Sequence, residues 1–322
     1  MRFAQYHLHV MAPAHDNRMN IGAKGLSGEG YKGHTFWDTE MFILPYFIYS
    51  APEIAKSLEE YRFLSLPGAH KKAGGNGYEG AQFPWESAWI DEVTPVWGAA
   101  DIVTGLPTKI WSGFIEQHIT ADVAYGAWEY YMVTGDEDFM ERCGYELILD
   151  TAKFWASRLE EGEDGKLHIN DVVGPDEYKE HVDDNASTNH MAAWNIRKAL
   201  EYCGLLRSEK PALYKALDEK LGLAALEPVW ADKLSRLYLP QPREDLVIPQ
   251  DRTYLTLKDI DLTKYKKQEN VGSIYRDYNQ EQITHIQVSK QADILIMFLL
   301  LENQFSAEVK AANWNYYEPR TL

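Results

Sequence analysis

The sequence of 322 residues predicts an all-α protein built from helical hairpins. Apolar residues recur at the helical spacing i, i+3, i+4 and i+7 through most of the chain. The alternation of apolar and polar residues that is typical of strands is scarce by comparison. Long loops rich in glycine separate the helical segments, and we expect them at residues 12–36, 68–84, 90–112 and 161–188.

Five stretches have the period of a helix that buries one or more faces. They are DTEMFILPYFIYS from Asp38, ITADVAYGAWEYYMVTG from Ile119, DEDFMERCGYELILDTAKFWASRLE from Asp136, NHMAAWNIRKALEYC from Asn189 and KQADILIMFLLLENQ from Lys290. Gly135 is expected to end one helix, and Asp136 is expected to cap the next. Pro211 and Pro228 are expected near the first turns of two further helices. Strand-like alternation is confined to LVIPQ at 246–250 and to the short segment at His168.

Composition excludes several classes of protein. The net charge of −17 would repel phosphate backbones, so we expect no nucleic-acid partner. Only Cys143 and Cys203 are present, which gives no disulfide framework and fits a reducing compartment. The first residues lack the features of a signal peptide, and the longest apolar run, near Ile294, is too short to span a bilayer. We therefore expect a cytoplasmic enzyme or binding protein with no membrane partner.

Two loops have nearly the same sequence. GEGYKGHTFWDTE runs from Gly28 to Glu40, and GNGYEGAQFPWES runs from Gly75 to Ser87. We expect the two loops to lie side by side over one central cavity, although the likeness is also compatible with a shared turn that has no functional meaning.

Each of these loops ends in a tryptophan followed by an acid, Trp37–Asp38 and Trp85–Glu86. An indole can stack on the apolar face of a pyranose ring while the neighbouring carboxylate accepts hydrogen bonds from its hydroxyls. For Asp38 a competing interpretation is a helix N-cap, because Asp-Thr-Glu opens an apolar run.

Glu177 is a candidate general acid. It directly follows Gly174-Pro175-Asp176, a turn rigid enough to fix the direction of the next side chain. The alternative is an ordinary solvated turn. Other motifs fail on inspection: GLSGEGYKG lacks the Gly-Lys-Ser/Thr of a phosphate loop, the segment from Asp183 lacks the glycine and glutamate of a calcium loop, and the histidines form no metal motif. We therefore predict no metal site.

Six motifs, in this order, resemble glycoside hydrolase family 65. They are GLSGEGYKGHTFWDTEMFILPYF, GYEGAQFPWESA, EQHITADVAY, DVVGPDEYKEHVDDNASTN, VSKQADILIMFLL and NWNYYEPRTL. Members of that family are mostly inverting phosphorylases of α-linked glucose disaccharides such as maltose, kojibiose, nigerose and trehalose. The resemblance implies an (α/α)6 barrel, with Glu177 as proton donor to the glycosidic oxygen. It also implies that Trp37 and Asp38, together with Lys290 and Gln291, hold the donor glucose.

The sequence departs from the family pattern at several places. Family members carry a β-sandwich domain before the barrel and a phosphate-binding His-x-Ser-Ser segment after Tyr-Tyr-Glu-Pro-Arg-Thr. We therefore expect residues 1–322 to be a catalytic barrel domain that is incomplete at its C-terminal end and inactive when isolated. Lys179 stands where many members have histidine, and Ser187 stands where an aromatic residue is common. Because of these two changes, the resemblance does not define the acceptor side.

The function expected from the resemblance is phosphorolysis with inversion, in which a disaccharide and inorganic phosphate are the substrates and no cofactor is needed. Phosphate is already a nucleophile, so a second carboxylate to activate water is unnecessary. A homodimer of the full-length enzyme is a further expectation. Two alternatives remain open: an inverting α-glucoside hydrolase of the same family, and a non-catalytic glucan-binding fragment.

Overall fold

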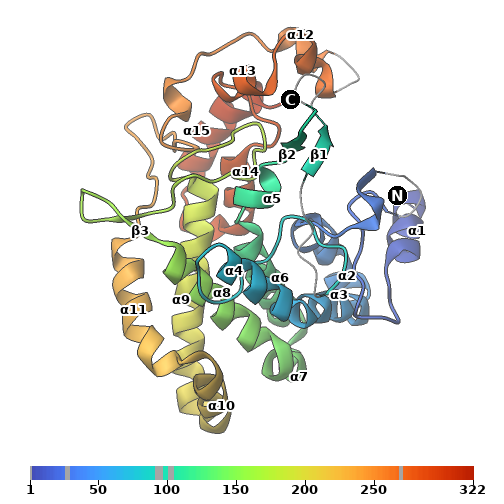
Figure 1. Cartoon of the computed structure of the whole chain (residues 1–322), viewed down its shortest axis with the longest axis vertical. Coiled ribbons are helices and arrows are strands. Elements are labelled where there is room, and N and C mark those ends of the chain that lie inside the picture. The colour runs from blue at the N-terminus through green and yellow to red at the C-terminus, as the bar shows by residue number, and fades with distance from the viewer. Residues whose placement is uncertain (1, 26–29, 91–96, 101–104, 268–270) are drawn as a thin grey trace. The chain divides into compact units, whose positions relative to one another are not determined.

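The computed structural model describes residues 2–25, 30–90, 97–100, 105–267 and 271–322 (Figure 1). The chain divides into two compact units. The first unit comprises Met1–Gly113, Ile119–Arg158 and Ala192–Ser235, and the second comprises Phe114–His118, Leu159–Met191 and Arg236–Leu322. Helical residues outnumber strand residues in both units, which agrees with the predicted all-α class.

The first unit holds most of the long helices. In chain order its elements are α1 (Arg2–Met11), a 3-10 turn (Gly30–Gly33), a π-helix (Thr39–Ile43), α2 (Leu44–Ser50), α3 (Pro52–Leu64), α4 (Leu66–Gly75), β1 (Trp97–Ala100), β2 (Pro107–Lys109), α5 (Ser112–Ile115), α6 (Ile119–Thr134), α7 (Glu137–Phe139), a second π-helix (Met140–Gly144), α8 (Tyr145–Arg158), α10 (Pro211–Leu221) and α11 (Leu223–Arg236). The chain also passes between the units within α5 and within α9 (Ala186–Glu209).

Helix α6 is the central element of this unit, because it packs against α2, α3 and α8. Its residues are buried almost continuously from Ile119 to Ala127. Small residues allow this close packing, and Gly126 is the clearest case: a Cβ there would lie 2.8 Å from Oε1 of Glu59 on α3.

The junction between α6 and α7 follows the sequence prediction. Gly135 has a φ of 66° and donates its N–H to the carbonyl of Tyr131, which closes α6. Asp136 then accepts a hydrogen bond from the backbone N–H of Phe139 at 3.0 Å and caps α7. The predictions for both residues are confirmed.

Several predicted boundaries were wrong. Residues 68–75 belong to α4 rather than to a loop. Residues 91–96 and 101–104 of the predicted loop 90–112 lie outside the described residues, and its described part includes the antiparallel pair β1 and β2. Pro211 does open α10, but Pro228 lies inside α11, which begins at Leu223.

The second unit contains shorter elements. They are β3 (Glu160–Glu161), β4 (Leu167–His168), a 3-10 turn (Tyr254–Thr256), α12 (Thr263–Lys266), a 3-10 turn (Val271–Arg276), α13 (Gln280–Thr284), α14 (Asp293–Leu300), a 3-10 turn (Glu302–Gln304), α15 (Ala307–Tyr317) and a last 3-10 turn (Glu318–Arg320). The short strand predicted at His168 is confirmed, because β3 and β4 form an antiparallel hairpin with Glu160 opposite His168.

The strand predicted at 246–250 is absent from the described structure, and the backbone contacts give the reason. The N–H of Ile248 donates to Oδ1 of Asn313 at 2.9 Å, and the carbonyl of Ile248 accepts from the hydroxyl of Tyr317 at 2.6 Å. Because side chains satisfy these backbone groups, Ile248 lies fully buried without a partner strand.

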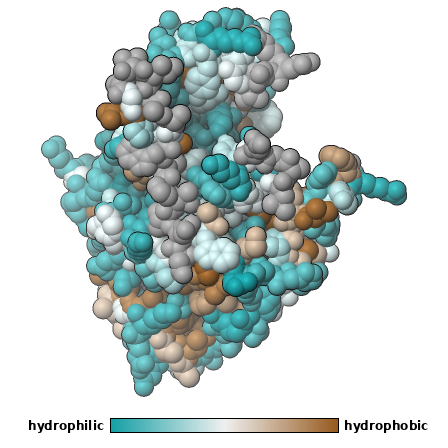
Figure 2. All heavy atoms as spheres, turned by 45° about the vertical axis from the view of Figure 1, so that its right-hand side comes forward, coloured by the Kyte–Doolittle hydropathy of each residue, from teal (hydrophilic) through white to brown (hydrophobic). Residues whose placement is uncertain are grey.

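Figure 2 shows a face on which hydrophilic residues predominate and hydrophobic residues lie between them. Among the described helices, α14 is the most apolar, with the sequence DILIMFLL. None of the helices in the described part of the chain is long and apolar enough to cross a membrane.

Candidate active site

The two similar loops lie side by side in the first unit. Thr35 and Ser87 exchange backbone hydrogen bonds of 2.9 and 3.0 Å and so form an antiparallel bridge. Beside this bridge, the ring of Phe36 meets the ring of Trp85 edge-on at 4.9 Å. The prediction that the two loops are neighbours is therefore confirmed. Residues 26–29 of the first loop lie outside the described residues.

Trp37 and Asp38 follow directly after this bridge. Trp37 is 4% exposed, and its ring lies 5.3 Å from that of Phe42. Asp38 is partly exposed and immediately precedes the π-helix Thr39–Ile43, but its side chain makes no capping hydrogen bond. The N-cap interpretation of Asp38 was therefore wrong. π-helical turns are rare and occur often at functional sites, which agrees with a binding role at this position.

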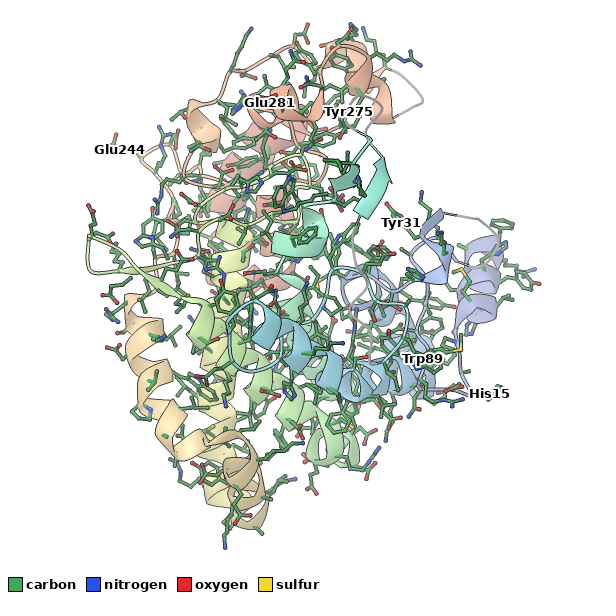
Figure 3. All side chains as sticks on the ribbon, viewed as in Figure 1. His15, Tyr31, Trp89, Glu244, Tyr275 and Glu281 are labelled. Atoms are coloured by element: carbon green, nitrogen blue, oxygen red, sulfur yellow. The ribbon has the colours of Figure 1, made fainter. Side chains whose placement is uncertain are left out.

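Trp85 and Glu86 stand on the second loop. Trp85 is 7% exposed, so its ring contributes mainly to packing against Phe36. Oε1 of Glu86 lies 2.5 Å from Nδ1 of His34 on the first loop. The phenol ring of Tyr31, labelled in Figure 3, packs at 4.7 Å against Phe36 on the same loop. The ends of both loops thus form one cluster of aromatic rings and polar groups.

In the second unit, the turn before Glu177 is held by the buried carboxylate of Asp176. Oδ1 accepts hydrogen bonds from the backbone N–H groups of Lys290 at 2.8 Å and Tyr178 at 3.2 Å. Oδ2 accepts from Nε2 of Gln250 at 2.9 Å. The turn is therefore fixed by several independent contacts, which supports the expectation that it sets the direction of Glu177.

The residue after Glu177 anchors the turn in apolar surroundings. Tyr178 is 3% exposed and belongs to a hydrophobic cluster that also contains Leu262, Tyr265, Ile274, Ile283, Ile286 and Val288. Its ring also meets that of Tyr275, labelled in Figure 3, at 5.8 Å. In the sequence, Glu177 thus stands between the buried carboxylate of Asp176 and the buried aromatic ring of Tyr178.

Glu177 and Lys290 contact each other directly. The ammonium of Lys290 donates to Oε2 of Glu177 at 2.7 Å, and both side chains stay partly exposed. The neighbouring Gln291 has a buried Oε1 that accepts no hydrogen bond from any described residue. A buried amide oxygen without a partner is unusual in a folded protein and suits a ligand hydroxyl. Three of the predicted site residues therefore lie together in this unit.

Burial shifts the ionisation of the groups beneath Glu177. It raises the pKa of Asp176, against the opposing effect of the Lys179 charge and of the hydrogen bond from Gln250. It raises the pKa of Asp293 well above the usual range, and the charge of Asp176 adds to this shift. Buried carboxyl groups with raised pKa values thus lie next to the loop that carries Glu177.

Lys179 is a buried residue of the second unit. It is 1% exposed, and its ammonium donates to the carbonyls of Ile283 and Ile286, both at 2.7 Å. Burial lowers its pKa. Lys179 thus ties the loop that carries Glu177 to the segment 283–286. Ser187 is likewise buried, at the start of α9.

The predicted residues form one group in each unit. Trp37, Asp38, Trp85 and Glu86 belong to the first unit, and Glu177, Lys290 and Gln291 belong to the second. Within the described ranges, no group of three or more His, Cys, Asp or Glu side chains could hold a metal ion.

Sequence reasoning missed the contacts that support these residues. The sequence identifies Asp176 only as part of a turn. Its position directly before Glu177 is the one signal that could have indicated its supporting role. Arg62 and Glu40 form a buried ion pair of 2.5 Å. The sequence does not indicate this pair, because each residue resembles an ordinary charged position of a helix.

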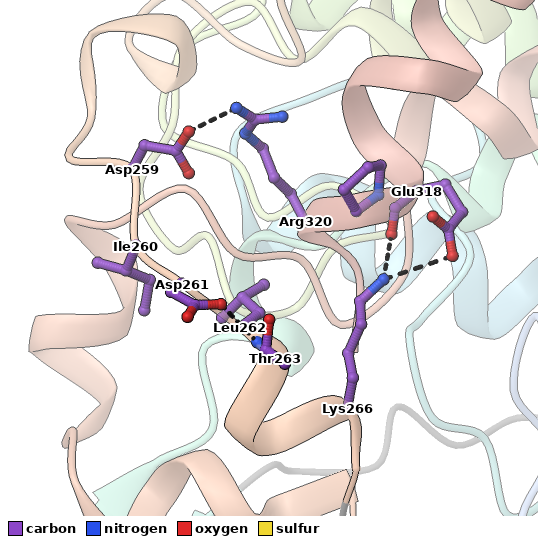
Figure 4. A pocket seen from close by; sticks show the side chains of 9 residues that line it. Asp259, Ile260, Asp261, Leu262, Thr263, Lys266, Glu318 and Arg320 are labelled. Atoms are coloured by element: carbon purple, nitrogen blue, oxygen red, sulfur yellow. Dashed lines mark hydrogen bonds and ion pairs between the residues drawn. The ribbon is translucent and has the colours of Figure 1, made fainter.

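A separate cavity of about 380 Å³ lies in the second unit (Figure 4). Arg320 donates to Asp259 at 2.5 Å on one side of it, and Lys266 donates to the backbone carbonyl of Glu318 at 2.7 Å on the other. The residues that line it include Glu318 and Arg320 of the YYEPRTL motif but none of the predicted site residues.

The fold is shared with a solved structure. A chain from the human microbiome that carries a provisional kojibiose phosphorylase name superposes with a TM-score of 0.83 at 28% identity, over 100% of this chain and 40% of that one. The all-α prediction is thereby confirmed, and the match is consistent with the (α/α)6 barrel.

The chain belongs to glycosyl hydrolase family 65: the model of the family's central catalytic domain matches residues 2–322. It is 51% identical to a kojibiose phosphorylase of Halothermothrix orenii, covering 100% of this chain and 41% of the relative. It is 43% identical to a kojibiose phosphorylase of Escherichia coli, covering 99% of this chain and 41% of the relative. A nigerose phosphorylase of Lachnoclostridium phytofermentans is 37% identical, and the match covers 100% of this chain and 43% of that relative. The chain spans less than half the length of these curated relatives.

Proposed function

We propose that this chain is the catalytic domain of an inverting phosphorylase that cleaves an α-linked glucose disaccharide into β-glucose 1-phosphate and glucose. The observation that carries the proposal is the placement of Glu177 on a turn fixed by Asp176, in contact with Lys290. The names of the relatives support kojibiose as the first substrate to test. Nigerose, trehalose and maltose follow as further candidates. One family model covering residues 2–322 supports treating both units as parts of one catalytic domain.

In the proposed reaction, Glu177 gives its proton to the glycosidic oxygen while that oxygen leaves the anomeric carbon. An oxygen of hydrogen phosphate forms the new bond to the anomeric carbon from the opposite face, which inverts the configuration. The proton of the hydrogen phosphate balances the one that Glu177 gave, so the carboxyl group is restored at the end of each cycle. No cofactor or metal takes part.

The remaining site residues are proposed to hold the donor glucose. Asp38 and the amide of Gln291 accept or donate hydrogen bonds at the hydroxyl rim of the sugar, and the Trp37 indole faces the ring. Lys290 directs the carboxyl group of Glu177. Trp85 and Glu86 support the Trp37 loop through Phe36 and His34.

The test is an assay of glucose 1-phosphate release in the natural full-length context of the chain, with kojibiose, nigerose, trehalose and maltose as substrates. The proposal expects release that requires phosphate, with the β configuration of the product seen by NMR. Release of free glucose without phosphate would instead establish the α-glucoside hydrolase. Binding of disaccharide without turnover under either condition would establish the non-catalytic glucan-binding alternative.

A further inference from the structure

One guanidinium group contacts both ends of the segment that carries Trp37 and Asp38. Nη2 of Arg62 donates to the backbone carbonyl of Phe36 at 3.2 Å. The same guanidinium also binds Glu40 in a bidentate manner, with Nε donating to Oε1 at 2.5 Å and Nη2 donating to Oε2 at 2.8 Å. Phe36 directly precedes Trp37, and Glu40 follows Asp38 by two positions. Because Arg62 stands on α3, it ties this segment to the helical core of the first unit.

These contacts are shielded from water. Arg62 is 1% exposed and Glu40 is 0% exposed. The guanidinium lies near the rings of Tyr61 and Phe83, at 5.8 and 5.9 Å from their centroids. A bidentate arginine–carboxylate pair has a defined geometry that a lysine cannot reproduce. The pair therefore constrains the direction of the backbone as well as its position.

Side chains of α3 and the backbone of α6 pack closely around the ion pair of Arg62 and Glu40. A Cβ on Gly126 of α6 would lie 2.8 Å from Oε1 of Glu59 and 3.1 Å from Cγ of Glu40. Glu59 is itself fully buried, and neither of its oxygens has a hydrogen-bond partner among the described residues. Apolar side chains of the same volume would often give equal or greater stability than a buried ion pair such as that of Arg62 and Glu40. The arrangement is therefore better explained by the geometry it imposes.

We propose that Arg62 is a positioning residue for the donor-sugar pair Trp37 and Asp38. Arg62 binds Phe36 and Glu40 at the same time and so fixes the backbone between them. It thereby sets the directions in which the Trp37 indole and the Asp38 carboxylate point. Binding groups lose much of their effect when they are displaced by about 0.5 Å or more. This inference rests on the proposed function, because it takes Trp37 and Asp38 to be the groups that hold glucose.

The first experiment needs no ligand. Arg62→Lys keeps a positive charge beside Glu40, but one ammonium cannot bridge both ends of the segment. The N–H groups of Thr39 and Met41 donate to the carbonyls of Phe36 and Trp37. We expect their hydrogen exchange to accelerate on the order of tenfold, with α8 unchanged. The matched control is Arg142→Lys, which alters a half-exposed arginine paired with Glu60 and Asp138.

If Arg62→Lys does not fold, the double variant Arg62→Met/Glu40→Gln removes both charges and keeps the volume of the core. The same acceleration at Thr39 and Met41 is expected from it. Exchange at these two amides that matches the Arg142→Lys control, in whichever variant folds, would overturn the proposed clamp.

The second experiment measures kinetics in the natural full-length context. Arg62→Lys should raise the KM for the disaccharide roughly three- to tenfold and lower kcat, in protein assayed well below its Tm. In an Asp38→Ala background the same change should have a much smaller effect on KM, because Arg62 acts through that segment. Leu206→Ala, a buried change on α9, controls for general loss of stability.

The outcomes separate the two proposals. If Asp38→Ala leaves KM and kcat unchanged while Arg62→Lys accelerates exchange, the proposed sugar-binding role of Asp38 fails and the clamp remains. If Asp38→Ala impairs sugar binding but Arg62→Lys alters only Tm, as Leu206→Ala does, the positioning role fails and the proposed function stands. Additive effects of Asp38→Ala and Arg62→Lys on KM would also overturn the positioning role.

Discussion

Lys290 is held by two consecutive residues, through its backbone by Asp176 and through its side chain by Glu177. Oδ1 of Asp176 accepts from the Lys290 N–H at 2.8 Å, and Oε2 of Glu177 accepts from the Lys290 ammonium at 2.7 Å. Along the chain, Glu177 and Lys290 are separated by 113 positions. The backbone of Lys290 is thus fixed by the same turn that presents Glu177, which places the two side chains next to each other.

Glu177→Gln should lower turnover by about 10²–10⁴-fold while leaving disaccharide binding nearly unchanged. An amide cannot give a proton to the leaving oxygen, but it keeps the shape of the side chain. The measurement is kcat in the natural full-length context, with binding followed by calorimetry. Glu180→Gln makes the same chemical change three positions later on the same loop and should leave kcat near the original value. Retention of more than about a tenth of the activity in Glu177→Gln would reject Glu177 as the acid.

Asp38→Ala and Gln291→Ala should each raise the KM for the disaccharide and lower kcat. Each change removes a hydrogen-bond partner of a sugar hydroxyl, which costs about 1–3 kcal/mol in a closed pocket. Steady-state kinetics and thermal melting of the same preparations provide the comparison. A variant that melts at a lower temperature but keeps both kinetic constants would show that its residue supports the fold and does not touch the sugar.

Gly80→Ala should destabilise the first unit far more than Gly77→Ala. Both glycines have positive φ angles, 73° and 82°, so both variants share the cost of a left-handed alanine. A Cβ on Gly80 would in addition lie 2.5 Å from the carbonyl oxygen of Asp150 on α8, whereas Gly77 has open space. We expect a further loss of about 1–3 kcal/mol for Gly80→Ala in chemical denaturation. Equal losses in the two variants would show that the loop can shift away from α8.

Glu59→Gln should stabilise the protein increasingly as pH rises from about 4.5 to 8. Burial raises the pKa of Glu59 well above its usual value of 4.5, and the charge of Glu40 adds to the shift. Between the unfolded and folded pKa values, the folded state binds a proton that the unfolded state has lost. The stability from this group is therefore fully present below the unfolded pKa and is lost as pH rises through the folded pKa. Glutamine does not ionise and avoids this loss.

The measurement for Glu59 is the difference in Tm between the variant and the original protein across that pH range. Other titrating groups are shared by both proteins and largely cancel in the difference. Glu53→Gln changes an exposed residue of the same helix and should give a flat difference. A flat difference for Glu59→Gln as well would mean that Glu59 ionises equally easily in the folded and unfolded chain.

Local sequence signals predicted the features that depend on neighbouring residues. The end of α6 at Gly135 and the cap at Asp136 follow from the conformational preferences of those residue types, and the structure confirms both. The pairing of the two similar loops was predicted from their likeness and is confirmed by the Thr35–Ser87 bridge. Glu177 was a candidate acid from its position after a rigid turn, whereas the roles of Lys290 and Gln291 came from the family resemblance. All three roles remain predictions.

Contacts between distant segments were not predictable in the same way. Arg62 reads as a polar position of an amphipathic helix, and only the fold reveals that its side chain reaches Glu40 and Phe36. The segment around Ile248 has the alternation of a strand, yet its hydrogen-bond partners are Asn313 and Tyr317, more than sixty positions later. Lys179 differs from the family pattern, but the sequence gives no sign that its ammonium donates to the carbonyls of Ile283 and Ile286.

The bridge between Thr35 and Ser87 has a consequence for engineering. The two loops share a register, so inserting or deleting a residue in one of them would shift its partner's hydrogen bonds and displace the aromatic contact between Phe36 and Trp85. Changing the length of one loop alone would therefore disturb this register. A library that transplants both loops together, as a cassette taken from one donor sequence, would preserve the register and sample working combinations.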